Sequence, residues 1–235
     1  MTAIPCKICG EPAPLHGVVD FNKSCEAHRG KFFELAGEPV WYHRCTGCGF
    51  LFTPHFDGWT PTMWCALVYN AEYHLFDPDG ADGSRARANA ALVLALFPEV
   101  AKQRLLDFGG GNGALADRLR LNGIDCLSYD PMNGDPPPVE FPTYGIITAF
   151  EVFEHTTTPI ETARQALSML REGGVLAFST LVCDGLPQQA CDWFYLSPRN
   201  GHVSIHTIKS LDLMFAAQGF QVRHLSNGLH VAQKS

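Results

Sequence analysis

The second half of the chain alternates between short apolar runs and segments with helical spacing. The apolar runs end in turn residues, as buried strands do, and lie at 105–108, 124–129, 144–150 and 175–182. The helical segments place apolar residues three and four positions apart and lie at 85–97, 114–119, 158–170 and 208–218. Gly173 and Gly174 predict the end of the third helix. Strands that alternate with helices predict an α/β fold, in which a mainly parallel sheet carries helices on both faces.

The first predicted strand runs into a glycine-rich turn, Asp107-Phe-Gly109-Gly-Gly111-Asn-Gly113. Glycines allow the backbone to approach a ligand closely, and the N–H groups at the start of the following helix favour a carboxylate or a phosphate. The spacing Gly109-x-Gly111-x-x-Ala114 also satisfies the fingerprint of dinucleotide-binding loops. The glycines alone therefore leave two cofactor classes open, the nicotinamide dinucleotides and S-adenosylmethionine.

Two acidic residues bear on that choice. Asp107 would repel a pyrophosphate, but it suits the cationic end of S-adenosylmethionine. Asp130 closes the next strand, where an acid accepts both ribose hydroxyls in either class of cofactor. The alternative for Asp130 is a solvated turn residue, because Asp-Pro-Met-Asn-Gly is also turn chemistry.

A third strand, predicted at 144–150, runs directly into Glu151-Val-Phe-Glu-His155. The order of the glycine turn, Asp130, this segment and Leu170-Arg-Glu-Gly-Gly-Val-Leu-Ala-Phe178 resembles class I S-adenosylmethionine-dependent methyltransferases. Further along, the segments at 201–207, 210–211 and 217–220 resemble the tail of the subgroup that includes ubiquinone-type O-methyltransferases and many natural-product enzymes. The likeness spans residues 84–235.

The resemblance implies a Rossmann-like sheet, mostly parallel, that ends in an antiparallel hairpin at 220–225 and 228–232. The chain departs from the family pattern between Asp130 and Tyr144, where residues 131–143 are rich in proline and lack a clear apolar strand. Either the usual strand is absent, or residues 136–141 are a remnant of it with Asp135 or the backbone as the adenine partner.

Site residues follow from matching the family motifs onto this sequence. The expected cofactor-binding residues are Asp107, Gly109, Gly110, Gly111, Gly113, Asp130, Pro131, Met132, Phe150 and Glu151. A general base is needed only if the acceptor must lose a proton, and the candidates by residue type are His155, His202 and Glu151. His155 has an alternative role as a helix cap or packing residue, and His202 and His206 as loop residues satisfied by backbone.

In ubiquinone-type O-methyltransferases the Glu-Val-x-Glu-His segment is associated with a divalent cation. That resemblance nominates Glu151, Glu154 and His155 as ligands, although many relatives with this segment use no cation. Carboxylates and an imidazole are suitable donors for such an ion.

Near the N-terminus, Cys6-Lys-Ile-Cys9-Gly and Cys45-Thr-Gly-Cys48-Gly are two knuckles of the zinc-ribbon type. Two thiolates from each knuckle complete a tetrahedral four-sulfur site with no open position, so the sequence predicts a structural zinc at Cys6, Cys9, Cys45 and Cys48. Cys25 and His28 lie between the knuckles at metal-ligand spacing. They are interpreted as packing or surface residues, with a swapped ligand set left open, and His16 and His43 lie nearby in the sequence.

Four aromatic residues, Trp59, Trp64, Tyr69 and Tyr73, follow the second knuckle. They either fasten the N-terminal module to the catalytic domain or wall the acceptor pocket. Trp193, Phe194 and Tyr195 lie in the loop after the strand at 175–182, and they either shape that pocket or pack in the core. Zinc-ribbon-led methyltransferases of this kind include sugar C-methyltransferases. The turn-rich segment 77–83 predicts the boundary between a zinc-ribbon module at 1–80 and a methyltransferase domain at 84–235.

Composition narrows the partners and the compartment. The chain has 235 residues, of which 46% are hydrophobic and 17% charged, so it buries a substantial core. A net charge of −7 without basic runs speaks against nucleic acid, and no apolar stretch is long enough to cross a bilayer. The N-terminus lacks the features of a secretion signal, and the nine cysteines are an odd number. We therefore expect a cytoplasmic protein without a disulfide framework.

Together these features predict methyl transfer from S-adenosylmethionine to a small-molecule acceptor, such as a sugar nucleotide or a natural-product intermediate, at carbon or oxygen. The alternatives are an RNA or protein methyltransferase, a binder that retains the cofactor fold without catalysis and, least favoured, a dehydrogenase. The pattern of residues does not specify the acceptor or the oligomeric state.

Overall fold

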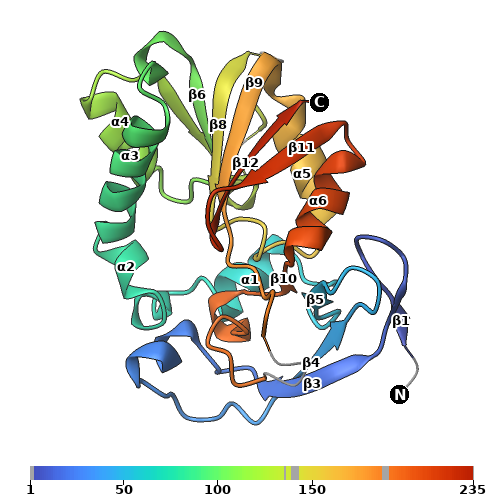
Figure 1. Ribbon diagram of the computed structural model, residues 1–235. Coiled ribbons are helices and arrows are strands. Elements are labelled where there is room, and N and C mark those ends of the chain that lie inside the picture. The colour runs from blue at the N-terminus through green and yellow to red at the C-terminus, as the bar shows by residue number, and fades with distance from the viewer. Residues whose placement is uncertain (1–2, 135, 139–142, 187–190, 235) are drawn as a thin grey trace. The chain divides into compact units, whose positions relative to one another are not determined.

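The computed structural model describes residues 3–134, 136–138, 143–186 and 191–234 (Figure 1). The chain forms two compact units, and neither is a single stretch of sequence. The first unit contains Met1–Pro78, Phe153–Ile160 and Leu181–Met214, and the second contains Asp79–Val152, Glu161–Thr180 and Phe215–Ser235. The first division falls inside the turn-rich segment 77–83. The two later segments of the first unit lie within the part of the chain that the sequence assigns wholly to the methyltransferase domain.

The second unit is built on a six-stranded sheet with the order β11-β12-β9-β8-β6-β7. Its strands are β6 (Leu105–Phe108), β7 (Cys126–Tyr129), β8 (Tyr144–Phe150), β9 (Leu170–Ser179), β11 (Phe220–His224) and β12 (Leu229–Lys234). Neighbours from β7 to β9 pair in parallel, whereas β12 pairs antiparallel with both β9 and β11. This confirms the predicted mainly parallel sheet and its C-terminal antiparallel hairpin.

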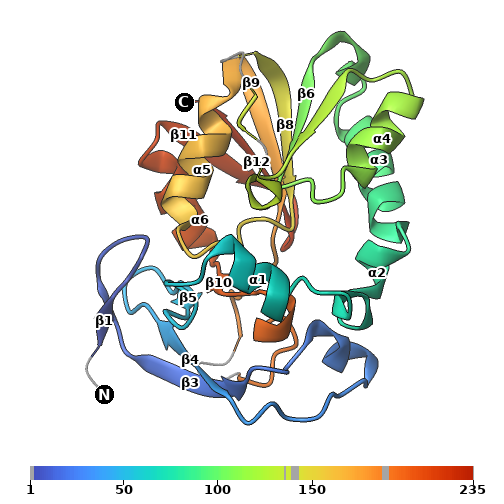
Figure 2. The same cartoon turned by 180° about the vertical axis from the view of Figure 1, so that it is seen from behind.

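Helices lie on both faces of this sheet, as Figures 1 and 2 show. One face carries α3 (Ser84–Leu96) and α4 (Ala114–Leu121) side by side, and the other carries α5 (Pro159–Ser168). Short 3₁₀ turns follow α3 and β7, as η3 (Val100–Lys102) and η4 (Pro131–Asn133). Apolar side chains of α3, α4 and the strands form the core between helices and sheet, including Val93, Leu105, Leu115, Leu119 and Ile146.

Two local expectations need correction or remain open. The helix at 158–170 ends at Ser168, and β9 begins at Leu170 rather than at Val175. The prediction was wrong because the strand continues through a register shift, in which Leu170 pairs with Tyr144 and Val175 with Ile146, so the glycines lie inside a strand. Between β7 and β8 the described residues form η4 and no strand, and residues 135 and 139–142 lie outside the described part of the chain.

The first unit contains two small antiparallel sheets. Four strands have the order β10-β5-β4-β3, and they are β3 (Leu15–Asp20), β4 (Pro39–Arg44), β5 (Leu51–Phe52) and β10 (Ser204–Ile205). The second sheet pairs β1 (Ile4–Pro5) with β2 (Pro12–Ala13). Strand β10 comes from far along the chain and pairs with β5, Ser204 opposite Phe52. This pairing is one reason why the segment 181–214 belongs to the first unit.

Short helices complete the first unit, and they are η1 (Cys25–Arg29), α1 (Pro61–Leu67), η2 (Tyr73–Leu75) and η5 (Pro198–Asn200). Thr60 caps α1, because its hydroxyl accepts a hydrogen bond from the backbone N–H of Met63. Two helices span the division between the units, α2 (Pro78–Ala81) and α6 (Ile208–Ala216). No helix in the described ranges is both long and apolar enough to cross a bilayer.

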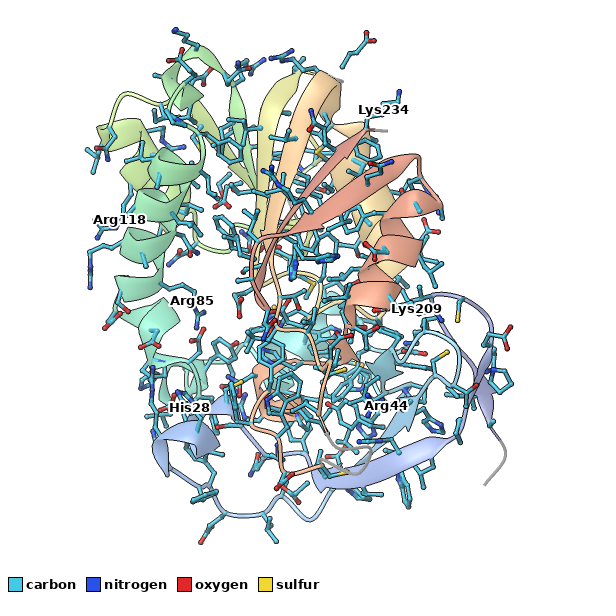
Figure 3. The ribbon with its side chains drawn as sticks, in the orientation of Figure 1. His28, Arg44, Arg85, Arg118, Lys209 and Lys234 are labelled. Carbon is cyan, nitrogen blue, oxygen red and sulfur yellow. The ribbon has the colours of Figure 1, made fainter. Side chains whose placement is uncertain are left out.

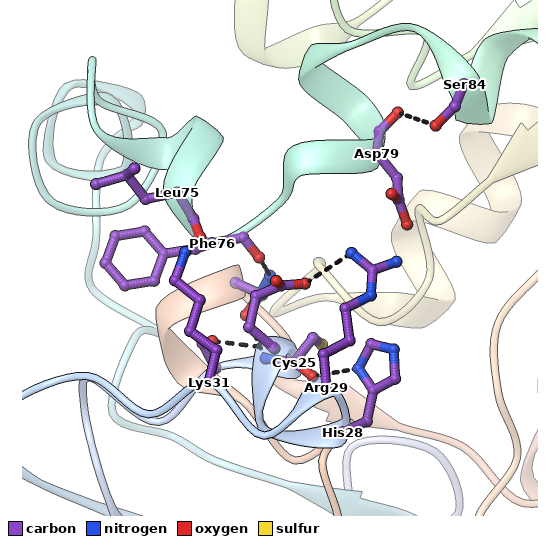
Figure 4. Close-up of polar contacts among 11 residues, drawn as sticks. Cys25, His28, Arg29, Lys31, Leu75, Phe76, Asp79 and Ser84 are labelled. Atoms are coloured by element: carbon purple, nitrogen blue, oxygen red, sulfur yellow. Dashed lines mark hydrogen bonds and ion pairs between the residues drawn. The ribbon is translucent and has the colours of Figure 1, made fainter.

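The aromatic residues that follow the second knuckle belong to the core of the first unit. Trp64 stacks on Phe56 with ring centroids 5.2 Å apart, and Trp59 meets Trp64 edge-on at the same distance. Tyr69 and Tyr73 pack edge to face at 5.1 Å. A hydrogen bond connects the loop after η1 to η2, because Lys31 Nζ donates to the carbonyl of Leu75 at 2.9 Å (Figure 4).

Candidate functional site

The loop between β6 and α4 is a backbone cradle with one closed side and one open side. A Cβ atom at Gly110 would lie 2.3 Å from Ser128 Oγ and 2.6 Å from Asp107 Oδ2, so no larger residue fits there. Gly111 has a φ of 55°, and a Cβ there would meet nothing within 4 Å. The chain therefore needs glycine at Gly110 for lack of space, and the positive φ at Gly111 favours glycine there. The space beside Gly111 is where a ligand can approach the backbone.

Asp107 lies beneath this loop on β6 and is only 3% exposed. Its Oδ1 accepts a hydrogen bond from Thr148 Oγ1 at 2.9 Å, which connects β6 to β8. Burial raises the pKa of Asp107 to about 7, Thr148 opposes that shift, and the nearby charge of Asp130 adds to it. A buried carboxylate that is costly to ionise alone is a suitable neighbour for a cationic ligand.

Asp130 holds the loop and the turn after β7 together. Its Oδ2 accepts from the backbone N–H of Gly111 at 2.9 Å, and its Oδ1 accepts from that of Met132 at 2.8 Å, which caps η4. Asn133 adds a second connection, because its Nδ2 donates to the carbonyl of Gly111 at 2.7 Å. Each carboxylate oxygen has a second lone pair, so Asp130 still has acceptor capacity for ligand hydroxyls.

Glu151 follows β8 directly in a backbone conformation that is rare for residues other than glycine. Its φ is 56°, the one positive φ of a non-glycine residue in the described chain. Hydrogen bonds with Ser179 stabilise this geometry, since Ser179 Oγ accepts from the Glu151 N–H at 2.9 Å and donates to Glu151 Oε1 at 2.8 Å. Strained backbone at the carboxyl end of a parallel strand is typical of ligand sites in α/β folds.

A polar cluster in the first unit brings Glu154, His155 and His202 together. One donor atom from each lies within 4.8 Å of the others, and Glu154 is completely buried. Tyr195 Oη donates a hydrogen bond to Glu154 Oε1, and the ring of His155 meets that of His202 edge-on at 4.8 Å. One carboxylate and two imidazoles can accept protons or ligate a divalent cation.

Hydrogen bonds orient both histidines. Nδ1 of His202 lies 2.9 Å from the carbonyl oxygen of Tyr195, and a carbonyl only accepts, so this nitrogen carries the hydrogen. In the neutral ring, Nε2 is then the nitrogen that can take a proton. His155 Nδ1 lies 3.1 Å from Tyr69 Oη, and a Cβ at Gly201 would come within 2.8 Å of that hydroxyl and 3.0 Å of that nitrogen.

The two cysteine knuckles meet in the first unit. Sγ of Cys6 lies 3.6 Å from that of Cys48, Sγ of Cys9 lies 3.4 Å from that of Cys45, and all four sulfurs are within 4.8 Å of one another. A tetrahedral zinc with bonds of about 2.3 Å would place its sulfurs roughly 3.8 Å apart, so the four side chains fit the metal that the sequence predicts.

Backbone N–H groups in the knuckles also favour thiolates. Ile8 donates to Cys6 Sγ at 3.4 Å, and Gly47 and Cys48 donate to Cys45 Sγ at 3.3 and 3.4 Å. The hydrogen bond with Cys48 lowers the pKa of Cys6 to about 5 and raises that of Cys48, so the pair shares one proton. A cation would favour release of that proton as well.

The sequence is also similar to proteins of known family. The sequence model of a methyltransferase-domain family matches residues 81–225, which is more than half of the chain. The chain belongs to this methyltransferase family. The ubiquinone biosynthesis O-methyltransferases of two Aliivibrio fischeri strains are 29% identical to it over 34% of this chain. The match spans 44% of those relatives, less than half of their length.

Solved methyltransferase structures share the fold. The crystal structure of TnmH superposes with a TM-score of 0.55 at 18% identity and covers 77% of this methyltransferase and 64% of that chain. The Burkholderia thailandensis 1,6-didemethyltoxoflavin-N1-methyltransferase superposes with a TM-score of 0.54 at 13% identity and covers 86% of this chain and 98% of that chain. Both confirm the fold class predicted from the strand and helix pattern.

Within this methyltransferase, the predicted site residues fall into two groups. The expected cofactor residues, from Asp107 through Asp130, Met132 and Phe150 to Glu151, all belong to the second unit, at the carboxyl ends of β6, β7 and β8. His155 and His202 belong to the first unit, together with Glu154. The sequence nominates Glu151, Glu154 and His155 as ligands of a divalent cation. Glu151 belongs to the second unit, and the cluster within the first unit contains His202 instead.

Cys25 and His28 do not form a metal site with other ligands in the described part of the chain. Cys25 Sγ lies 3.0 Å from Ser197 Oγ, and His28 Nδ1 donates to the carbonyl of Cys25 at 2.6 Å (Figure 4). His43 likewise donates from Nδ1 to the carbonyl of Ala13 at 3.1 Å. Packing and local hydrogen bonds account for these residues.

Sequence reasoning missed the residues that orient the site. Thr148 on β8 and Gly201 after η5 each contact a predicted site residue, and Tyr69, which was expected to fasten the N-terminal module or wall the acceptor pocket, also contacts His155. Tyr195 was expected to pack in the core or wall a pocket, but its hydrogen bond to Glu154 was not anticipated. No local signal marks these contacts, because each joins residues at least 41 positions apart.

Proposed function

We propose that this protein transfers a methyl group from S-adenosylmethionine to a small-molecule acceptor, at carbon or oxygen. The observation that carries the proposal is the cradle at Gly109–Gly113, which is open beside Gly111 and has an acid on each side, Asp107 and Asp130. Membership in the methyltransferase family supports it. The relatives named for ubiquinone biosynthesis and for 1,6-didemethyltoxoflavin act on small molecules, as their names state.

The cofactor would be held by the second unit. Asp107 would face its cationic amino acid portion, Asp130 its ribose hydroxyls, and Gly109, Gly110, Gly111 and Gly113 would line it with backbone. The remaining proposed contacts are Pro131, Met132, Phe150 and Glu151, of which Met132 is 36% exposed and so accessible to an adenine ring. When bound, the cofactor supplies an electrophilic methyl group on a sulfonium.

His155 and His202 would serve the acceptor. Four positions of chain join Glu151 to His155, so covalent geometry keeps these two residues within about 14 Å. Nε2 of His202 is the proton-accepting nitrogen of its neutral ring, since Nδ1 donates to Tyr195. A base of this kind takes the proton that an acceptor hydroxyl or carbon acid must lose, and it contributes about 10²–10⁴-fold to the rate.

The four cysteines would hold a structural zinc. All four ligand positions are filled by thiolates, which leaves none for water or substrate, so the ion would stabilise the two knuckles rather than take part in the reaction. The small β1-β2 sheet and the β4-β5 turn, which carry the knuckles, have few apolar residues of their own around the site, including Ala13, Phe50 and Phe52. A metal compensates for so small a core.

Calorimetric titration with S-adenosylmethionine, its demethylated product and NAD tests the proposal, with metal content measured on the same sample. We expect micromolar binding of the first two, no binding of NAD and about one zinc per chain. Incubation with methyl-labelled cofactor and a panel of sugar nucleotides and phenols then identifies the acceptor class. Binding of NAD alone would overturn the proposal and assign the glycine loop to a dinucleotide.

A further inference from the structure

The backbone on either side of His155 lies in irregular turns between β8 and α5, and it is held by hydrogen bonds from elsewhere in the first unit. The backbone N–H groups of Val203 and Ser204 donate to the carbonyl of Glu154 at 2.8 and 3.0 Å. Ser204 Oγ donates to the carbonyl of Thr156 at 2.6 Å. Carbonyl groups in an irregular turn need partners of this kind, because a helix or sheet ladder does not supply them. These bonds fix the backbone immediately before and after His155.

A further hydrogen bond to this turn comes from the first cysteine knuckle. Lys7 lies between the two cysteines of that knuckle, and its Nζ donates to the carbonyl of Thr157 at 3.1 Å, two residues after His155. The ammonium group also pairs with Asp57 and lies 5.5 Å from the ring centroid of Phe52. Only 17% of the Lys7 side chain is exposed, so water competes little for these contacts. The partners thus direct all three donors of the ammonium group.

The second knuckle contacts the segment that carries His202. Thr207 Oγ1 donates to the carbonyl of Cys48 at 2.6 Å, and Lys209 Nζ, near the start of α6 (Figure 3), donates to the carbonyl of Gly47 at 2.7 Å. Strand β10 lies between His202 and Thr207 and pairs with β5, which follows the knuckle. Each knuckle therefore holds one of the two segments that bring the two histidines together.

We propose that Lys7 is a positioning residue for methyl transfer, because its bond to the carbonyl of Thr157 holds His155 in place. This inference rests on the proposed function, in which His155 serves the acceptor. A base acts only within hydrogen-bond reach of the proton that it removes, and a displacement of about 1 Å can cost on the order of 10²-fold in rate. The knuckle that carries Lys7 is part of the four-cysteine site, so a closed metal site without catalytic ligands helps to determine the rate.

Steady-state kinetics of Lys7 variants test the proposal. Lys7→Met removes the ammonium group but keeps an unbranched stem beside Phe52, so we expect kcat to fall about tenfold while the Kd of S-adenosylmethionine and the zinc content stay unchanged. Lys7→Arg keeps a cationic donor and should recover most of the rate. Equal losses of rate, cofactor affinity and zinc in Lys7→Met would mean that Lys7 only stabilises the knuckle, and this result overturns the proposal.

Asp57→Asn is the matched control. It removes the charge that pairs with Lys7 but keeps an acceptor oxygen, so the bond from Lys7 to Thr157 remains and kcat should equal that of the wild type. A loss of rate in Asp57→Asn as large as that in Lys7→Met overturns the proposal, because the ion pair rather than the contact with Thr157 would then be responsible.

Nuclear magnetic resonance of protein with isotope-labelled histidine gives a readout that does not depend on turnover. The ring nitrogen shifts of His155, assigned by their loss in His155→Gln, should change in Lys7→Met at constant pH and stay unchanged in Asp57→Asn. Unchanged shifts in Lys7→Met overturn the positioning role. Failure of the proposed function would appear separately, as a wild type that neither binds S-adenosylmethionine nor methylates an acceptor.

Discussion

The phenol oxygen of Tyr69 lies 3.1 Å from Nδ1 of His155, and the backbone of Gly201 closes over this pair. Gly201 has a φ of 87°, so its conformation and its lack of a side chain are both required. The pair and His202, the residue after Gly201, come from three separate segments of the first unit. Their contact is the strongest structural reason to assign a chemical role to His155.

Removal of the Tyr69 hydroxyl should slow methyl transfer without weakening cofactor binding. Tyr69→Phe keeps the ring that packs on Trp64 and Tyr73, so we expect kcat to fall about tenfold through loss of orientation. His155→Gln should cost about 10²-fold or more if it is the base. Steady-state kinetics and calorimetry on the same samples separate the two effects, and equal losses of rate and cofactor affinity would contradict this assignment.

Two glycine variants should separate folding from cofactor binding. Gly111→Asn tolerates the positive φ and points its side chain into open space, so we expect a folded protein that no longer binds S-adenosylmethionine. Gly110→Ala should lose stability as well, because its Cβ would collide with Ser128 and Asp107. Thermal unfolding and calorimetry measure both properties. Wild-type affinity in Gly111→Asn would place the cofactor elsewhere.

Cofactor affinity should depend on the ionisation of Asp107. Its pKa of about 7 means that the free protein is largely protonated there at pH 6, whereas a cationic ligand favours the carboxylate. We expect binding of S-adenosylmethionine to strengthen about tenfold between pH 6 and pH 7.5 and to level off above that. Asp107→Asn should bind weakly and without this pH dependence, and a flat profile in the wild type would refute the role of Asp107.

The same residue should make the fold less stable as pH rises. The folded pKa of Asp107 is raised from 3.8 to about 7, so stability is greatest below the unfolded value and decreases through that interval. Between pH 5 and pH 8 the penalty amounts to about 2–3 kcal/mol. Denaturant unfolding of wild type and Asp107→Asn at both pH values isolates this contribution. The difference in stability between the two proteins should change by that amount in favour of the variant at pH 8.

Loss of the second knuckle should remove the metal and loosen the first unit. We expect Cys45→Ser with Cys48→Ser to contain no zinc and to unfold at a lower temperature, because metal binding and folding of this region are coupled. Cys65→Ser is the matched control, since Cys65 is exposed on α1 and lies outside the cluster. Emission spectrometry of the purified proteins gives the metal content, and zinc retained in the double variant would rule out this site.

Local sequence was enough for the parts of the fold that depend on neighbours along the chain. Strand β8 spans the predicted residues 144–150, and α3 differs from its prediction by one residue at each end. Of the predicted strand at 124–129, only Cys126–Tyr129 form a strand, which is β7. The start of β9 was missed because pairing with β8 continues through the glycines at 173 and 174, and pairing depends on a strand that is distant in sequence.

The amino-acid sequence by itself determined the α/β class, the glycine loop with its two acids and the two cysteine knuckles, because each rests on periodicity or on a motif of a few adjacent residues. Only the tertiary structure decided that β10 pairs with β5 and that Glu154, His155 and His202 share one cluster with Tyr69 and Tyr195. Such contacts are selected by the packing of a whole unit, and no short segment records which distant side chain will complete a hydrogen bond.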